Sequence, residues 1–265
     1  MIRGTSILLA VCAACSPDAI AVEPDGPSAA VDGPGGTPSV EGTPVASFET
    51  TSCSTGDVLE LSRQIADEVN CMLPGQLVKF DASATIEFAG AAVLPYVGER
   101  ARAQLYAAAA AGNGKVVRVT SAFRTVVQQY LLRRWFELGR CGITAAAEPG
   151  RSNHESGRAL DLTNYSEWIG TFEANGWAND VPGDPVHFDH LASPDIRGAD
   201  VRAFQKLWNR NAPADPIDED GAFGPATAAR VMQAPAEGFG IGASCATRMI
   251  VEYGLPTLED LQLNE

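Results

Sequence analysis

The chain has 265 residues, of which 45% are hydrophobic and 20% are charged, a composition typical of folded globular proteins. It is longer than most single domains, so we expect two folded parts of unequal size. The 33 acidic residues outnumber the 19 basic ones and give a net charge of -14. This negative field repels phosphate backbones and argues against a nucleic-acid partner.

The first part of the chain, residues 1–15, has the layout of an export signal. Arg3 precedes an apolar stretch from Ile7 to Val11, and two alanines precede Cys15. The stretch is too short to span a membrane as a helix. Because Cys15 resembles the acylated cysteine of bacterial lipoproteins, we expect an exported protein of the periplasm or cell envelope. A membrane tether through acylated Cys15 is one alternative.

Residues 16–51 are rich in Pro, Gly, Ser and Ala and have no periodic apolar pattern, which predicts a disordered linker. Four cysteines follow, and in an exported protein they predict two disulfides with three alternative pairings. These cysteines are Cys53, Cys71, Cys141 and Cys245. None belongs to a C-x-x-C pair, so the spacing disfavours a zinc–thiolate site.

The apolar pattern between residues 52 and 192 predicts a domain in which helices mix with short strands. The predicted elements are helices over 58–72, 101–111 and 126–138 and a strand over 117–120. The strand leads into Ser121–Arg124. Because strands and helices do not alternate regularly, we expect the α+β class, with a small antiparallel sheet flanked by helices.

All three histidines of the chain fall within 37 positions, from 154 to 190. His154 lies in the segment RSNHESGRALD, in which a two-residue turn at 156 and 157 predicts a hairpin. In that hairpin His154 would lie diagonal to Asp161, about 7 Å away, so that both side chains could reach one metal ion. Ala159 between them would leave room for the ion.

A second segment, DPVHFDH, supplies His187 as a third ligand and Asp184 as a carboxylate three residues earlier. Three protein ligands leave one position for water, which distinguishes a catalytic zinc site from a structural one. We therefore expect His154, Asp161 and His187 to bind Zn²⁺, the alternative being ordinary histidines beside carboxylates. His190 is expected to be a surface group or a group behind the ligands. Asp189 is either a rival base or an orienting group.

The two segments match the patterns S-x-H-x-x-G-x-A-x-D and [DE]-x-x-H. On these residues the region from Cys53 to His190 resembles the zinc D-alanyl-D-alanine carboxypeptidases, relatives of the vancomycin-resistance dipeptidases and of hedgehog signalling domains. The matching residues are Ser152, His154, Gly157, Ala159, Asp161, Asp184 and His187. The resemblance implies that Asp184, where many members have Glu, is the catalytic base.

Three further residues are candidate site residues. Arg124 lies in SAFRT, which resembles the family segment S-x-[FY]-R-[ST], and the resemblance implies that its guanidinium faces the scissile carbonyl. The alternative is a solvated arginine. Gln128 and Ser152 are candidate substrate contacts, and Ser152 could equally cap a turn.

Residues 198–245 resemble the small helical peptidoglycan-binding module. Four apolar residues, Val201, Phe204, Leu207 and Trp208, form one helical stripe, and the segment DEDGAFGPATAARV follows. The stripe could serve wall binding or only packing. Residues 246–265 form a C-terminal tail, which Cys245 would join to the fold.

Together these features predict a monomeric, zinc-dependent metallopeptidase that hydrolyses peptidoglycan stem peptides as a D-alanyl-D-alanine carboxypeptidase. One alternative is a peptidoglycan endopeptidase with the same zinc site. Another is a non-catalytic cell-wall-binding protein that retains the zinc scaffold.

Overall fold

The structure is a computed structural model that describes residues 40–245. The predicted export signal, most of the predicted linker and the predicted tail over 246–265 lie outside the described residues. All of the described residues belong to one compact unit. Within them, no helix is both long enough and apolar enough to cross a membrane.

Four short strands form a mixed sheet in the order β2-β4-β5-β6. They are β2 (Ile86–Phe88), β4 (Val117–Ser121), β5 (Ala159–Leu162) and β6 (His187–Asp189). β5 runs antiparallel to β4 and β6, whereas β2 runs parallel to β4. The parallel pair arises because α3 (Glu99–Ala111) returns the chain between the two strands, and a crossover of this kind keeps the strand direction. The α+β class is confirmed, but the sheet is not wholly antiparallel as predicted.

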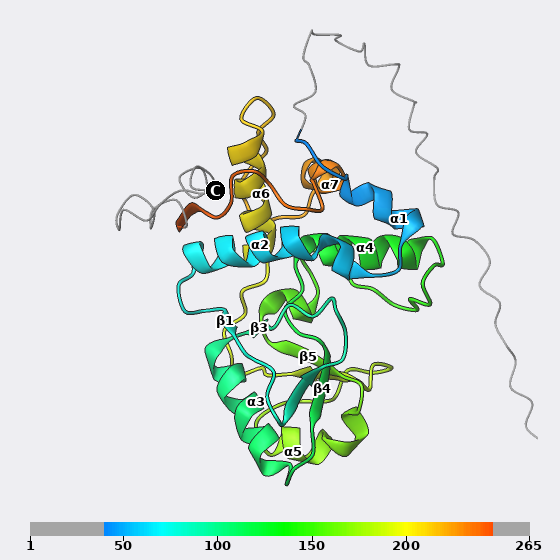
Figure 1. The fold of residues 1–265 in the computed structure, drawn as a ribbon, viewed down its shortest axis with the longest axis vertical. Coiled ribbons are helices and arrows are strands. Elements are labelled where there is room, and N and C mark those ends of the chain that lie inside the picture. The colour runs from blue at the N-terminus through cyan, green and yellow to red at the C-terminus, as the bar shows by residue number, and fades with distance from the viewer. Residues whose placement is uncertain (1–39, 246–265) are drawn as a thin grey trace, which may run out of the picture. The chain divides into compact units, whose positions relative to one another are not determined.

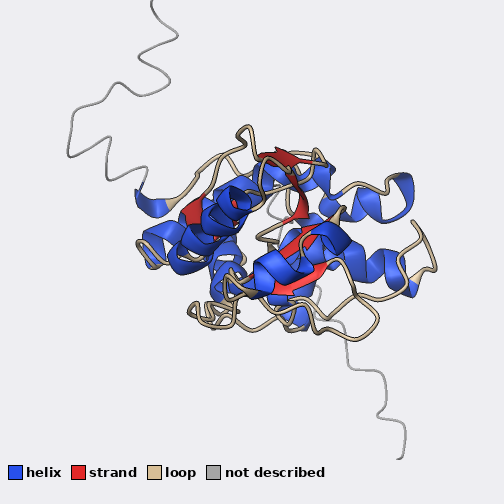
Figure 2. Ribbon diagram, turned by 90° about the horizontal axis from the view of Figure 1, so that it is seen from below, coloured by secondary structure: helices blue, strands red, loops and turns tan. Residues whose placement is uncertain are grey.

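Helices and aromatic side chains cover this sheet, and they form the first of two hydrophobic cores. α3 and α5 (Ile169–Glu173) lie beside the strands in Figure 1. Figure 2, which views the molecule from below, shows helices around the strands. Phe172 and Phe188 are fully buried there with their ring centroids 5.0 Å apart. A second, two-stranded sheet pairs β1 (Val78–Lys79) with β3 (Tyr96–Val97).

A second core lies between the helices that follow the cysteines and the C-terminal helices. α2 (Leu59–Met72) and α4 (Val126–Glu137) confirm two predicted helices. In Figure 1 they run between the strands and the helices α6 (Ala199–Asn211) and α7 (Pro225–Gln233). Buried residues of all four helices belong to one apolar cluster. The segment 198–245 therefore shares a core with the predicted peptidase segment, and the domain boundaries at 192 and 198 stay a prediction.

The prediction of a disordered linker over residues 16–51 is wrong at the C-terminal end of that range. Val45 is fully buried, and its backbone N–H donates to the carbonyl of Ala234 at 3.0 Å. A 3-10 turn, η1 (Val45–Ser47), and a short helix, α1 (Phe48–Thr51), follow it. The composition of residues 16–51 is poor in apolar residues, but the few apolar side chains at its end pack against a segment nearly 190 positions away.

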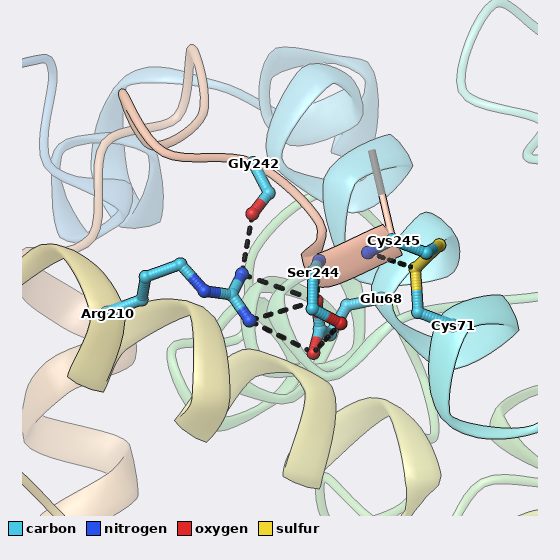
Figure 3. Close-up of a disulfide and its surroundings, with 6 residues drawn as sticks. All are labelled: Glu68, Cys71, Arg210, Gly242, Ser244 and Cys245. Atoms are coloured by element: carbon cyan, nitrogen blue, oxygen red, sulfur yellow. Dashed lines mark hydrogen bonds and ion pairs between the residues drawn. A yellow bond between two sulfur atoms is a disulfide. The ribbon is translucent and has the colours of Figure 1, made fainter. Parts of the chain in front are cut away.

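Two disulfides, Cys53–Cys141 and Cys71–Cys245, confirm the predicted number and select one of the three pairings. The second joins α2 to residues just after α7 (Figure 3). Beside it, the fully buried Glu68 accepts hydrogen bonds from the guanidinium of Arg210 and from the backbone N–H and hydroxyl of Ser244. The C-terminal end of the described chain is therefore held on α2 by a disulfide and by the hydrogen bonds from Ser244 to Glu68, whereas the ion pair with Arg210 joins α6 to α2.

Candidate metal centre

A 3-10 turn carries His154 in place of the predicted hairpin. The turn, η3 (Asn153–Ser156), ends at Gly157, whose φ of 71° lies in the left-handed region. The Ser152 hydroxyl accepts the His154 N–H, and the Glu155 carboxylate accepts the Ser152 N–H at 2.9 Å. This reciprocal pair is a capping box, which starts a helical turn. The pattern S-x-x-E was present in the sequence and is the signal that the hairpin prediction overlooked.

The three predicted ligands nevertheless converge. The Asp161 Oδ1 atom lies 3.1 Å from His154 Nε2 and 3.1 Å from His187 Nδ1, and the three ligand atoms lie within 4.8 Å of one another. Asp161 on β5 and His187 on β6 are direct partners in the sheet register. Ligand atoms around a tetrahedral ion with bonds of 2.0–2.2 Å lie roughly 3.3–3.6 Å apart. The group could therefore hold a metal ion.

The hydrogen bonds of His154 support a cation between the imidazole and the carboxylate. His154 Nδ1 lies 2.7 Å from the Ala122 carbonyl oxygen, to which it donates. The lone pair of Nε2 then faces Asp161, and burial lowers the pKa of His154, which disfavours a second proton on the ring. Two lone pairs 3.1 Å apart repel each other unless a cation lies between them. The nitrogen and oxygen donors are of the type that zinc binds.

Asp189 lies on the opposite side of the His187 ring from Asp161. Its Oδ1 atom is 3.2 Å from His187 Nε2, and its Oδ2 atom accepts a hydrogen bond from Asn153 Nδ2 at 2.6 Å. Burial lowers the pKa of His187, but the hydrogen bonds and charges of Asp161 and Asp189 outweigh this effect and raise it to about 9. Of the two roles considered for Asp189, the geometry favours orientation of His187.

Asp161 is ionised in this environment. Burial raises the pKa of its carboxyl group, but the neighbouring imidazoles of His154 and His187, together with the Arg124 guanidinium, hold the pKa well below its usual range. Arg124 Nη2 lies 3.6 Å from Asp161 Oδ2. The negatively charged Asp161 carboxylate therefore lies between the two imidazoles.

These residues line a pocket of about 660 Å³. Arg124, Ser152 and the exposed Asp184, three of the predicted site residues, line it as well. Arg124 is held in place because its guanidinium donates to Gln129 Oε1 at 3.0 Å and to Ser121 Oγ at 3.1 Å. Apolar residues also line it, namely Leu132, Phe136, Ile143, Ala145, Ala146 and Ala147.

Gln128 does not line this pocket. Its side chain is buried, accepts the Thr125 N–H at 3.3 Å and donates to the Ala92 carbonyl at 3.1 Å, so it caps α4. The next residue, Gln129, lines the pocket in its place and bonds to Arg124. Successive helical residues point about 100° apart. The T-x-x-Q pattern of Thr125 and Gln128 forms a capping box at the start of α4 and is the sequence signal that assigns Gln128 to the helix start.

His190 is apart from the ligand group. It is buried, its Nδ1 lies 2.9 Å from the Ser193 hydroxyl, and its ring centroid lies 5.3 Å from that of Trp177. It is therefore a packed core histidine rather than a surface group.

No protein-family model matches this chain, and a search of curated proteins also found no match. The functional argument therefore depends on the site itself: a buried His–Asp–His group beside a held arginine in one pocket.

Proposed function

We propose that this protein is an exported zinc-dependent metallopeptidase that hydrolyses peptidoglycan stem peptides, acting as a D-alanyl-D-alanine carboxypeptidase. The observation that carries the proposal is the convergence of His154, Asp161 and His187 in a pocket that also contains Arg124 and Asp184. The two sequence motifs that resemble the zinc carboxypeptidases contain all three ligands and Asp184. These two lines of support are different in kind, because the motifs describe the spacing of residues along the chain and the pocket describes distances between side chains in space.

The side chains divide the reaction between them. A bound zinc ion would act as a Lewis acid and would lower the pKa of its water to about 7. Asp184, exposed at the pocket wall, accepts a proton from the attacking water and returns it to the departing amine. Arg124, fixed by Ser121 and Gln129, stabilises the negative charge that develops on the peptide carbonyl oxygen.

The apolar part of the pocket lining supports a leaving group with a small apolar side chain. Three consecutive alanines, Ala145–Ala147, and Leu132 line the pocket. Backbone carbonyls of this alanine segment are tied back to α4, since Gln129 donates to Ala147 at 2.8 Å and Arg133 donates to Ala146 at 3.2 Å. A wall held in this way favours the methyl side chain of D-alanine over larger residues.

The decisive experiment incubates the purified protein with defined muropeptides, with zinc or with a chelator, and identifies the products by mass spectrometry. Loss of one terminal D-alanine, only with metal, supports the proposal. Halved cross-linked dimers would instead establish an endopeptidase. Retention on peptidoglycan without any product would establish a non-catalytic wall-binding protein.

Asp184→Asn tests the assignment of the base. We expect turnover to fall by about 10²- to 10⁴-fold while the zinc content stays unchanged, because general acid–base catalysis contributes about that much and Asp184 is not one of the three ligands. Asp180→Asn is the matched control, since Asp180 is an exposed aspartate four positions earlier that does not line the pocket. Normal turnover of Asp184→Asn with zinc bound would remove the base from Asp184.

A further inference from the structure

Two further cavities continue from the pocket of the candidate metal centre. A cavity of about 670 Å³ shares Arg151 with that pocket. A second cavity, of about 490 Å³, shares Arg197, Gly198 and Gly221 with the first. We call these two cavities the junction groove, because both the predicted peptidase segment and the C-terminal segment line them. The pocket and the junction groove therefore adjoin one another in series.

Close contacts between backbones shape the junction groove. Gly198 and Gly221 line both of its cavities and have φ values of 86° and 74°, in the left-handed region. A Cβ added at Gly198 would lie 3.1 Å from the Gly221 carbonyl oxygen, and one added at Gly221 would lie 2.9 Å from the Gly198 carbonyl oxygen. A side chain at either position would meet the opposing backbone, so the two segments approach as closely as only glycines allow.

Most of the charged side chains that line the junction groove already have partners. Glu148 pairs with Arg133 at 2.6 Å, and Lys206 pairs with Glu219 at 3.1 Å. Asp220 accepts one side-chain and one backbone N–H, at 2.9 Å and 2.8 Å. Glu148 and Asp220 are the two carboxylates of the lining, so its acidic groups are engaged elsewhere than with its arginines.

Two arginines of the lining differ from these residues. Arg197 pairs with Asp195, but no carboxylate of residues 40–245 lies within 4.0 Å of the guanidinium of Arg151 or Arg202. Both of these side chains are exposed. A guanidinium binds a carboxylate through two parallel hydrogen bonds. In a chain with a net charge of -14, the groove therefore offers two sites that favour an acidic ligand.

We propose that the junction groove binds an acidic peptide chain, the part of the stem peptide that precedes the cleaved bond, and that Arg151 and Arg202 pair with its carboxylates. A carboxypeptidase releases only the terminal residue, so the rest of the peptide must extend out of the pocket. Arg151 lines both the pocket and the groove, and Arg202 lies on α6. The C-terminal segment thus takes part in substrate recognition. This inference rests on the proposed function.

Two matched synthetic peptides test the proposal by binding to the full chain after chelator treatment. One peptide ends in D-alanyl-D-alanine and carries two side-chain carboxylates and an uncharged dye, and its twin has carboxamides in place of the carboxylates. Fluorescence anisotropy at low salt gives the two dissociation constants. We expect the acidic peptide to bind about tenfold more tightly, because each exposed ion pair contributes about two- to fivefold. Arg151→Gln combined with Arg202→Gln should abolish this preference.

Two control variants separate the junction groove from the overall charge of the protein. Arg100→Gln combined with Lys115→Gln removes the same charge at exposed residues that line neither the pocket nor the groove, and should keep the preference for the acidic peptide. Arg151→Lys combined with Arg202→Lys keeps the charge but not the paired hydrogen bonds, and should keep only part of the preference. Thermal unfolding shows whether each variant is folded.

Equal binding of the two peptides by the wild-type protein would overturn the proposal without any variant, as would an unchanged preference in the double glutamine variant. The zinc-loaded protein is assayed for hydrolysis of both peptides in parallel. A preference that depends on the two arginines, without cleavage, would keep the groove and refute the proposed function. Cleavage without such a preference would refute only the groove, so the two failures are distinguishable.

Discussion

His187 holds a proton in the metal-free protein that a metal ion must displace. Its Nδ1 faces Asp161 Oδ1 at 3.1 Å, and its Nε2 faces Asp189 Oδ1 at 3.2 Å. Burial opposes the charged ring, but the two carboxylates raise the pKa of His187 to about 9. At neutral pH the ring is therefore protonated before metal binds, and binding releases this proton.

The expected magnitude follows from this pKa. Each pH unit below about 9 weakens the apparent metal affinity tenfold, or about 1.4 kcal/mol, so affinity at neutral pH is about 100-fold below its plateau. The assay is chelator competition over a pH series, corrected for protonation of the chelator. The logarithm of affinity should rise with a slope of about 1 per pH unit up to about pH 9 and then level off. A flat profile across the neutral range would refute the reasoning.

Asp189→Asn sharpens the test. It removes one of the two carboxylates that raise the pKa of His187, so the plateau should begin at a lower pH. Asp218→Asn, at an exposed aspartate that does not line the pocket, removes the same charge and should leave the profile unchanged.

Because His187 is protonated in the metal-free protein, the free energy of unfolding of that protein should fall as pH rises, whereas the metal affinity rises. Because the pKa of His187 is raised above its unfolded value of about 6.5, its contribution is fully present below about pH 6.5 and is lost as pH rises to about 9. The shift corresponds to roughly 3 kcal/mol of unfolding free energy. Urea unfolding of the chelator-treated protein at the two pH values measures it, and equal stability at both would contradict the prediction.

Two predictions concern the fold. Gly112→Ala should destabilise the protein by about 1–3 kcal/mol, because the new Cβ would lie 2.2 Å from the fully buried Trp168 ring; Gly170→Ala, with open space, is the control in thermal unfolding. Replacing Cys53 and Cys141 together by serine should cost about 4 kcal/mol in urea unfolding, since that disulfide spans 88 positions. Wild-type stability of either variant would contradict the respective argument.

Three long helices, α2, α3 and α4, were predictable because their signals are local. The predicted ranges 58–72, 101–111 and 126–138 agree with α2, α3 and α4 to within two residues at each end. Apolar spacing and the glycines and prolines that end each helix act within a few turns, so no distant contact is needed to read them. The buried end of the predicted linker carried no such signal, because its stability comes from a segment far along the chain.

In the candidate site, too, local features were predictable from the sequence and features set by packing were not. The types of the ligands, two imidazoles and a carboxylate, follow from the short motifs, and they converge even though the hairpin expected between His154 and Asp161 is a 3-10 turn. The motifs did not predict which side of α4 faces the pocket, so Gln129 lines the pocket where Gln128 was expected. A local motif specifies which donor atoms are present, whereas packing sets the rotation of each element.

The sequence by itself therefore determined the α+β class, the main helices and the donor set of the candidate metal centre, since periodicity, stop signals and motif spacing act over short stretches of chain. Only the tertiary structure decided the cysteine pairing and the place of Asp189 beside the His187 ring. Each of these joins side chains from different elements, and their proximity results from how the two cores bring those elements together.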